Sequence, residues 1–394
     1  MQESHRPPRS ALRLGLILTD YFPYGGLQRD CLGVAKLCVQ RGHDVTVVCR
    51  TWEGPRPEGI RVLLTGQPGL TNQARNRRFL RLLHGSVFPR ERFDRIMAFS
   101  RIPGVDVYFG ADPCYEALVR RRKPAWFRWT PRYRHFAGLE KALYARGIRT
   151  RILLLTGTEI PVFQHLYGTE PGRFEVLPPN IRRWSIAKGD REESRRSVRS
   201  EAGGAPDSIV LAFIGSDFRR KGLARAITAL AALPSESRSH TLLLVAGQDK
   251  EAPFRELARK LAVSSQVRFL GARDDIRRLL LASDLLLHPA HSESAGMILL
   301  EAATAGVPVL TTDTCGYAFH IQRAHCGVVL PSPFSQQALD LALDEAIRSP
   351  ERPAWREAGL RYGQAEDLYS GHHRIVEILE EDSSARAPHP NPSP

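Results

Sequence analysis

The sequence lacks any run of apolar residues that approaches the ~20 residues of a membrane-spanning helix. It also lacks the pattern of an N-terminal signal peptide, because Arg13 interrupts the first apolar run and no small-residue cleavage site follows. Its six cysteines are scattered and include no C-x-x-C pair, so they indicate neither a metal-binding template nor a disulfide framework. These absences predict a protein of the reducing cytoplasm.

Acidic residues are few relative to basic ones. The 394 residues include 42 Asp and Glu against 56 Lys and Arg, which leaves a formal net charge of +14. Such an excess favours a polyanionic partner, whether nucleic acid, an anionic membrane surface or a phosphorylated substrate. The content of 42% hydrophobic and 25% charged residues is that of a globular protein, and the length favours two domains.

Strand and helix patterns alternate in two series along the chain. A strand from Leu12, a helix and a strand at 44–50 form a first βαβ unit, which predicts a parallel sheet. Further strands of this series are expected at 93–99, 105–110, 151–157 and 173–180. A charged stretch rich in Ser and Gly, 182–205, is expected to be a linker or an exposed helix. The second series places strands at 208–216, 240–247, 267–271, 284–290 and 307–312.

This alternation predicts an α/β protein with two Rossmann-like, doubly wound domains that face a central cleft. We expect an N-terminal domain at 11–180 and a C-terminal domain at 181–360. Helical patterns at 361–382 are expected to return to the N-terminal domain. The polar ends, 1–10 and 383–394, are expected to be disordered.

Gly25 and Gly26 lie between the first strand and a helix. Glycine lets a backbone approach a ligand closely, and the free N–H groups at the start of a helix favour anions. The turn is not G-x-G-x-x-G, and the second strand ends in Arg50 instead of an acidic residue that would bind a ribose. A dinucleotide site is therefore not expected, and a plain tight turn explains the two glycines equally well when they are taken alone.

Two further stretches carry candidate chemistry. In IGSDFRRKG, Arg220 and Lys221 stand at the head of a helix beside a glycine turn, which suits a diphosphate but also an ordinary surface cluster. In HSESAGMILLEAATAGVPVL, the small residues Ala295 and Gly296 leave N–H groups accessible for a phosphate. In the same stretch, Glu293 is placed to accept hydrogen bonds from sugar hydroxyls, and Glu301, roughly 12 Å further along a helix, to reach a ribose.

The pattern E-x-x-G-x-x-L-L-E-A-x-x-x-G-x-P-V in this stretch resembles that of the retaining family-4 glycosyltransferases of GT-B fold. With YFPYGGLQRD, FGADPCY and GSDFRRKG, the chain is similar, from about Leu12 to Leu368, to the members that add glucose to the lipopolysaccharide core. The resemblance implies UDP-glucose as the donor and a phosphorylated inner-core heptose as the acceptor. It also implies an α-linked product, no further cofactor and no essential metal.

The resemblance also assigns roles to residues. Arg220 and Lys221 would neutralise the diphosphate leaving group, Glu293 would bind the glucose hydroxyls, and Glu301 the ribose of UDP. Gly25, Gly26 and Asp30 would border the donor diphosphate and the acceptor. Asp112 corresponds to a carboxylate near the reacting sugar, either catalytic or acceptor-positioning, although a helix N-cap before Pro113 would look the same. The catalytic candidates are Asp112, Lys221 and Glu293; Ala295 and Gly296 join the donor-binding set.

Most of the positive charge falls in one segment, residues 117–151, which holds eleven Lys and Arg against Glu140 alone and is interleaved with aromatic residues. Such a composition predicts contact with an anionic membrane surface, as the resemblance also implies, at the cytoplasmic face of the inner membrane. A solvated basic face over core aromatics is the simpler alternative. No RNP, KH or helix-turn-helix pattern accompanies the charge, so no nucleic-acid partner is expected. A second basic cluster suits acceptor phosphates or a helix exterior: Arg75, Arg77, Arg78 and Arg81.

Other functions stay open at this level. A family-4 transferase with another UDP-sugar or another lipid-linked acceptor would carry the same motifs, because glucose, galactose and N-acetylglucosamine differ only in hydroxyl contacts. A UDP-sugar epimerase of similar fold would turn over its sugar nucleotide without an acceptor. A basic nucleic-acid-binding protein would ignore UDP-sugars and bind RNA with a steep salt dependence.

Overall fold

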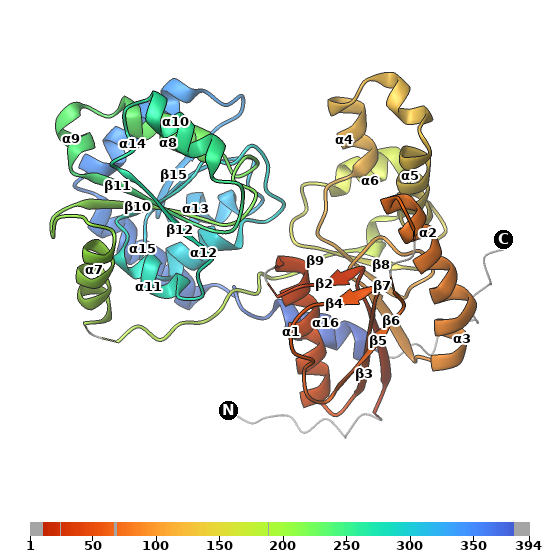
Figure 1. Cartoon of the computed structure of the whole chain (residues 1–394). Helices are drawn as coiled ribbons and strands as arrows, with labels where there is room; N and C mark the ends of the chain where they lie inside the picture. Colours follow the sequence, from red (N-terminus) through yellow and green to blue (C-terminus); the bar gives the residue numbers. More distant parts are fainter. Residues whose placement is uncertain (1–10, 24, 67–68, 188, 382–394) are drawn as a thin grey trace. The chain divides into compact units, whose positions relative to one another are not determined.

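The chain divides after Pro178 into two α/β units (Figure 1). The computed structural model describes residues 11–23, 25–66, 69–187 and 189–381. The first unit holds residues 1–178 together with 370–394, and the second holds residues 179–369. Residues 1–10 and 383–394, which were expected to be disordered, lie outside the described residues.

The sheet of the first unit is parallel, with the described strands in the order β5-β3-β1-β6-β7-β8-β9. These strands are β1 (Arg13–Ile17), β3 (Asp44–Cys49), β5 (Ile60–Leu64), β6 (Arg95–Ala98), β7 (Val107–Gly110), β8 (Arg151–Leu154) and β9 (Phe174–Val176). β1 is buried from Leu14 to Ile17 because helices cover both faces of the sheet, which is why it reads as one apolar run. Two short strands, β2 (Asp20–Tyr21) and β4 (Thr51–Trp52), pair beyond the ends of β1 and β3.

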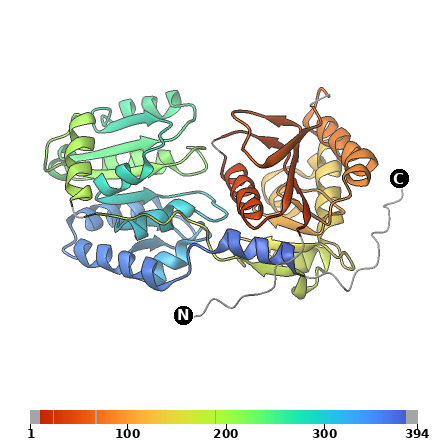
Figure 2. The same ribbon diagram turned by 90° about the horizontal axis from the view of Figure 1, so that it is seen from below.

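Helices cover the two faces of this sheet. On one face α1 (Gly26–Gln40) packs beside α16 (Gly371–Glu380), as Figures 1 and 2 both show. The other elements are α2 (Asn72–Leu82), the π-helical turn η1 (Leu83–Val87), α3 (Phe88–Glu91), α4 (Tyr115–Arg122), η2 (Ala125–Trp129), α5 (Pro131–Tyr144), α6 (Ile160–Tyr167) and η3 (Pro171–Arg173). Because Ile375, Val376 and Leu379 of α16 are fully buried against α1 and the sheet, the end of the chain completes the core of the first unit.

The second unit is also built on a parallel sheet, and its described strands run in the order β12-β11-β10-β13-β14-β15. These are β10 (Ile209–Ile214), β11 (Thr241–Ala246), β12 (Val267–Gly271), β13 (Leu285–His288), β14 (Val309–Thr312) and β15 (Gly327–Leu330). Its helices are α7 (Asp190–Glu201), α8 (Leu223–Ala232), α9 (Ser235–Ser239), α10 (Ala252–Lys260), α11 (Ile276–Ala282), α12 (Met297–Thr304), α13 (Ala318–Ala324), α14 (Gln336–Arg348) and α15 (Arg352–Ala365). The prediction of two Rossmann-like, parallel α/β domains is therefore confirmed.

The strand orders locate the places where ligands bind in such sheets. In each sheet the chain starts in the middle, at β1 or β10, extends to one side, and then resumes on the other side at β6 or β13. The crevice beyond the carboxyl ends of those two neighbouring strands is the usual ligand site of a doubly wound fold. In the second unit this places the loops after β10 and β13 side by side.

Two predictions need correction. The chain was expected to return to the N-terminal domain from residue 361, but it returns later. α15 runs to Ala365 within the second unit, and only the residues from Ser370 onward belong to the first unit. α15 stays there because it packs tightly on α12, so that a Cβ on Gly359 would lie 2.5 Å from the carbonyl oxygen of Ala303. The stretch 182–205 is also not a simple linker or exposed helix, because α7 packs on α11 and buries Val198 and Arg199.

The six cysteines, all within the described residues, are buried free thiols, which agrees with the prediction that they form no disulfide framework. In the described part of the chain, no helix is both long enough and apolar enough to cross a membrane.

Candidate active site

The loop between β10 and α8 carries two of the predicted residues. Phe218 is fully buried and anchors the loop in the core of the second unit. Gly222 ends the loop at φ +83°, and a Cβ there would lie 2.0 Å from the carbonyl oxygen of Pro289, so only glycine fits. This close approach brings the loop against the one that follows β13 and sets Lys221 beside Glu293.

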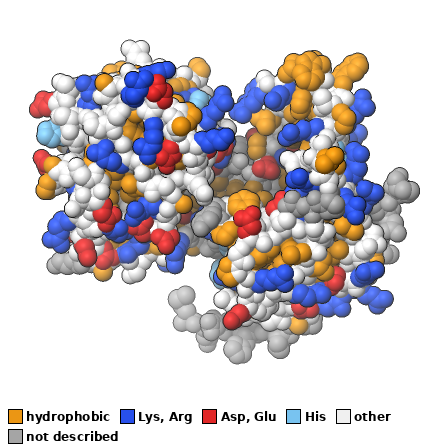
Figure 3. All heavy atoms as spheres, viewed as in Figure 1, with side chains coloured by type: hydrophobic (Ala, Val, Ile, Leu, Met, Phe, Trp, Pro, Cys, Tyr) orange, Lys and Arg blue, Asp and Glu red, His pale blue; other side chains and the backbone are white. Residues whose placement is uncertain are grey.

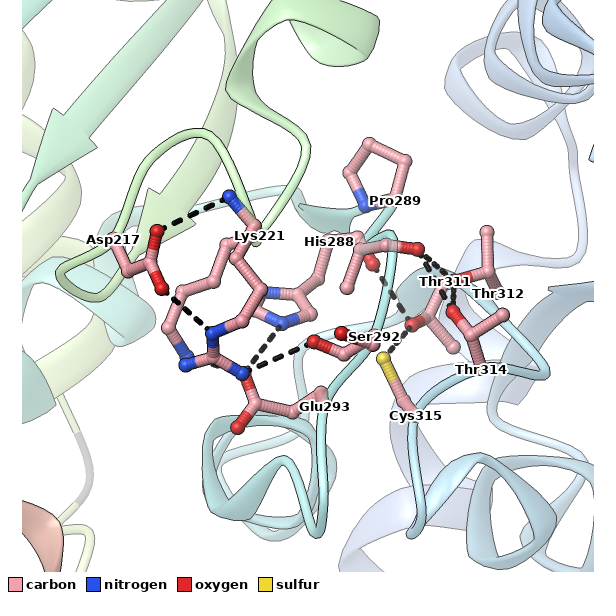
Figure 4. A network of polar contacts seen from close by, with 12 residues as sticks. Asp217, Lys221, His288, Pro289, Ser292, Glu293, Thr311, Thr312, Thr314 and Cys315 are labelled. Carbon is pink, nitrogen blue, oxygen red and sulfur yellow. Dashed lines mark hydrogen bonds and ion pairs between the residues drawn. The ribbon is translucent and has the colours of Figure 1, made fainter. Parts of the chain in front are cut away.

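Lys221, Arg220 and Glu293 form one network at the carboxyl ends of β10 and β13 (Figure 4). The Nζ atom of Lys221 donates to Oε2 of Glu293 at 2.7 Å, and Nη1 of Arg220 lies 3.3 Å from the same oxygen. Arg220 also donates from Nε to Asp217 at 2.8 Å and from Nη1 to the carbonyl oxygen of Ser292 at 3.0 Å. The structure therefore brings together three of the predicted residues, and it adds Asp217 as the residue that orients Arg220.

The electrostatics of this network keep Glu293 ionised. Burial alone would raise the pKa of Glu293, but the charge and hydrogen bond of Lys221 and the charge of Arg220 bring it below its ordinary value. Burial would likewise lower the pKa of Arg220, but the carboxylates of Glu293 and Asp217 outweigh it and raise that pKa. At neutral pH the site thus presents two cations held by one half-buried carboxylate.

His288, the last residue of β13, is a member of the site that sequence reasoning did not select. It is fully buried, and its Nε2 lies 3.9 Å from Oε2 of Glu293. Burial, together with the charge of Lys221, lowers the pKa of His288 to about 3, so the ring is neutral. Neither ring nitrogen has a hydrogen-bond partner among the described residues. Its position at the end of a buried strand was the only signal in the sequence.

The backbone around Glu293 is held by the loop after β14, which was also not selected from the sequence. The N–H of Glu293 donates to the carbonyl oxygen of Thr314 at 3.1 Å, and its own carbonyl oxygen accepts from Gly316 at 3.0 Å. The hydroxyls of Thr312 and Thr314 both donate to the carbonyl oxygen of Ala290, at 2.9 and 2.8 Å (Figure 4). The orientation of Glu293 is therefore fixed by backbone on both sides.

α12 starts at the same place, with Gly296 as its N-cap at φ +89°. Ala295 is buried, and its carbonyl oxygen accepts from the N–H of Tyr317 at 2.7 Å. Glu301 lies half-buried in the second turn of α12. The predicted roles of Ala295, Gly296 and Glu301 toward a nucleotide stay predictions.

Comparison with known proteins shows the family of the chain. The family model of glycosyl transferases group 1 matches residues 194–361, which include the whole network. The chain is 43% identical over 363 residues to the lipopolysaccharide glucosyltransferase WaaG of Escherichia coli K12, an alignment that covers 92% of this chain and 97% of the relative. The chain belongs to the WaaG family. It is therefore a hexosyltransferase of lipopolysaccharide biosynthesis, as the motifs predicted.

Solved structures support the family assignment and the GT-B fold. The crystal structure of WaaG, a glycosyltransferase involved in lipopolysaccharide biosynthesis, matches with a TM-score of 0.86 at 42% identity, covering 94% of this chain and 100% of that one. HepE of Anabaena, solved in complex with UDP and glucose, matches with a TM-score of 0.70 at 17% identity, covering 93% and 99%. At that identity the likeness to HepE shows the fold alone.

The remaining predicted residues of this WaaG-family chain belong to the first unit. Gly25 is the N-cap of α1, where a Cβ would lie 1.8 Å from Oε1 of Gln28, whereas a Cβ on Gly26 would meet no atom within 4 Å. Asp30, one turn further along α1, lies 3.1 Å from Nε2 of His372 in α16. Gly25 and Asp30 thus have structural partners within the first unit. Their predicted roles at the donor and acceptor stay predictions.

Asp112 follows the carboxyl end of β7, and its side chain is 67% exposed, with Nη1 of Arg101 3.7 Å away. The alternative that Asp112 caps the following helix is wrong, because the N-cap of α4 is Cys114. The helix start is satisfied by Glu140, whose fully buried carboxylate accepts from the N–H groups of Tyr115 and Glu116 at 2.6 and 3.0 Å. Asp112 is therefore free of a capping role.

The basic segment, residues 117–151, forms α4, η2 and α5. Ten of its eleven basic side chains are exposed, and Arg151 is half-buried. Its aromatic residues divide: Trp126 and Trp129 are 67% and 77% exposed, whereas Tyr144 is buried and stacks on Phe163 at 3.8 Å. Figure 3 shows hydrophobic and basic side chains side by side over the part of the first unit that carries α4 and η2. Only the two tryptophans offer a large apolar surface in this segment, so the core accounts for part of the aromatic pattern.

Proposed function

We propose that this WaaG-family enzyme transfers glucose from UDP-glucose, with retention of configuration, to a heptose of the lipopolysaccharide inner core. The observation that carries the proposal is the pair of cations, Lys221 and Arg220, held by the half-buried carboxylate of Glu293 at the switch point of the second sheet. Such a pair beside the N-terminus of α8 suits a diphosphate. The 43% identity to a lipopolysaccharide glucosyltransferase supports the choice of glucose and of this acceptor class.

The proposed chemistry follows from where charge develops. As the bond between the anomeric carbon and the phosphate oxygen breaks, its electron pair moves onto the diphosphate, and an acceptor hydroxyl bonds to the same carbon and loses its proton. Lys221 and Arg220 stabilise the charge that grows on the leaving diphosphate. Glu293, kept ionised by those cations, accepts hydrogen bonds from the glucose hydroxyls. Because two fixed cations already serve the diphosphate, no metal ion is required.

We assign Asp112 to the acceptor side, as a catalytic or an acceptor-positioning carboxylate. Its 67% exposure leaves it accessible to a ligand, and Nη1 of Arg101 lies 3.7 Å from its carboxylate. Glu301 is assigned to the ribose of UDP, and Gly25 and Gly26 to the border of the donor diphosphate.

The test is the release of UDP from UDP-glucose, UDP-galactose and UDP-N-acetylglucosamine, with and without lipopolysaccharide truncated to its inner core. We expect turnover only with UDP-glucose and acceptor together, and no loss of activity in EDTA. Lys221→Met should lower kcat about 10²- to 10³-fold, the usual cost of removing one stabilising group from such a transition state. Lys260→Met, which removes an exposed lysine of α10, is the matched control and should leave kcat unchanged.

Other outcomes would contradict this proposal in distinct ways. Conversion of one UDP-sugar into another without acceptor and without net release of UDP would indicate an epimerase. Equal activity with another UDP-sugar would refute glucose as the donor. Wild-type kcat in Lys221→Met would refute the assigned site.

We also propose that the enzyme works peripherally at the cytoplasmic face of the inner membrane, through residues 117–151. The exposed basic side chains would each contribute about 1 kcal/mol near an anionic leaflet, and exposed tryptophans favour the interface. Trp126→Ala with Trp129→Ala should weaken co-sedimentation with phosphatidylglycerol vesicles about tenfold without changing stability. Leu341→Ala, at an exposed apolar residue of the second unit, is the control. Unchanged binding of the double variant would contradict the assignment of this segment.

A further inference from the structure

A cavity of about 570 Å³ lies on the second unit, away from the candidate active site. It is open to solvent on one side and is bordered by the ends of α7, α14 and α15. Its charged lining residues are Arg191, Glu192, Arg195, Asp284, Arg348, Arg352 and Arg356. Asp284 directly precedes β13, whereas Glu293 and Lys221 lie beyond the carboxyl ends of β13 and β10. The length of β13 thus separates the cavity from the network of Lys221 and Glu293, by about 10 Å or more at ~3.3 Å per residue.

The acidic residues of the cavity do not balance its arginines. Oδ1 of Asp284 accepts from Arg195 at 2.6 Å, and Oδ2 accepts from the buried Arg199 at 2.7 Å and from the N–H of Val210 at 2.9 Å. Arg348 pairs with Asp344. The carboxylates around the cavity are therefore largely committed to structural partners, and Glu192 is an exposed residue at its edge.

Two arginines of α15 have a buried Nε atom that donates to no described residue. The Nε atoms of Arg352 and Arg356 are buried and have no hydrogen-bond partner, and neither side chain forms an ion pair with a residue in the described ranges. They stand at i and i+4 on α15, and Arg191 and Arg195 stand at i and i+4 on α7. Like charges at this spacing destabilise a helix by a few tenths of a kcal/mol. Without an anion, the cavity thus holds an excess of positive charge that Asp284 and Glu192 offset only in part.

The charges of these arginines act on one another. Burial lowers the pKa of Arg191 to about 10, with Arg356 and Arg195 adding to the effect. Burial, followed by the charge of Arg195, also lowers the pKa of Arg356. Arg191 is further fixed by donating to the carbonyl oxygens of Leu281 and Gly306, at 3.2 and 3.3 Å, so it cannot turn away from its neighbours.

We propose that this cavity binds an anion that carries at least two phosphate charges, such as a diphosphate or a phosphomonoester. The guanidinium groups of Arg352 and Arg356 present planar donor forks that match phosphate oxygens, and the anion replaces the partners that they lack. The volume lies within the range of small-molecule sites, roughly 300–1,000 Å³. Neither the motifs of the family nor the proposed transfer reaction uses this cavity, so the proposal stands independently of the donor assignment.

The test is calorimetric titration with inorganic pyrophosphate of the full chain, of Arg352→Gln/Arg356→Gln, and of Lys221→Met, in which the candidate donor site is disabled. We expect Lys221→Met to retain one pyrophosphate site. The double variant should bind pyrophosphate at that site at least tenfold more weakly than the wild type. Arg361→Gln, at an exposed arginine of the same helix, is the control and should bind like the wild type. Equal binding by the double variant and the wild type, or no site in Lys221→Met, would overturn the proposal.

Thermal unfolding of the wild type gives a second readout that needs no variant. Pyrophosphate should raise Tm more than sodium chloride of equal ionic strength, whereas an equal effect of the two salts would count against a specific site. Without ligand, Arg352→Gln/Arg356→Gln should melt at or above the wild-type temperature, because the substitutions remove repulsion.

Parallel titration with a short-chain phosphatidic acid separates the two sources of such an anion. Tighter binding of the lipid supports a headgroup, tighter binding of pyrophosphate supports a soluble metabolite, and binding of neither refutes the site.

Discussion

The contact between Lys221 and Glu293 can be tested by a double-mutant cycle on the stability of the second unit. At 2.7 Å and an effective dielectric constant of about 20, Coulomb's law gives this pair a gross attraction of about 6 kcal/mol. Arg220, at 3.3 Å from the same oxygen, contributes about 5 kcal/mol on the same basis. Desolvation of several kcal/mol for each buried ion offsets most of this attraction.

Lys221→Met should therefore destabilise the second unit by about 2 kcal/mol, less than the 3–5 kcal/mol expected for an isolated buried pair, because Arg220 still faces Glu293. Glu293→Gln should cost a similar amount, since it leaves two cations close together. The double variant should lose about 1–2 kcal/mol less than the sum of the single variants. Urea unfolding at pH 7, analysed for the transition of the second unit, measures all three.

The pH dependence of this coupling has a definite sign. The pKa of Glu293 lies below its ordinary value in the folded chain, so its stabilising contribution is present above the unfolded value, near 4.5, and is lost as the pH falls through the lower, folded value. The coupling should thus be unchanged at pH 6 and should shrink below about pH 4. Single-variant effects that add within about 0.4 kcal/mol at pH 7 would refute the reasoning that the two side chains act as a pair.

Two other predictions concern the second unit. Gly222→Ala should destabilise it by at least about 2 kcal/mol, because the residue adopts φ +83° and the new Cβ meets the carbonyl oxygen of Pro289. The control Gly203→Ala, at φ +68° with open space around the new Cβ, should cost about 1 kcal/mol. Thermal unfolding measures both variants. Burial lowers the pKa values of His288 and His320 to about 3 and about 4, so both rings stay neutral in the folded chain while the unfolded chain takes up protons below pH ~6.5. Lowering the pH from 7 to 5 should cost about 2 kcal/mol for each ring, and His320→Gln should remove one of these contributions from the pH dependence of unfolding. An unchanged pH profile in His320→Gln would contradict the assignment.

The central strands of both sheets could be predicted because strands buried on both faces are continuous apolar runs, as in β1 and β11. β5 and β15 were missed, and both lie at an edge of their sheet and are mostly half-buried or exposed. Arg61 interrupts the apolar residues of β5, and β15 has only four residues. The glycine-rich loops that follow β10 and β13 were also visible in the sequence, because loops at the carboxyl ends of parallel strands carry the ligand-binding residues of this fold.

By itself, then, the sequence determined the parallel α/β architecture, the family, and the identity of Arg220, Lys221 and Glu293 as candidate residues. Only the tertiary structure decided their partners. Lys221 meets Glu293 across 72 positions, and Asp30 meets His372 across 342. Such contacts depend on which strands become neighbours in the sheet and on where the last helix packs. The same holds for the arginine cavity, because its arginines come from three helices that are separate in the sequence and are brought together only by the packing of the second unit. Local patterns specify which faces are buried, whereas the order of the strands sets which side chains face each other.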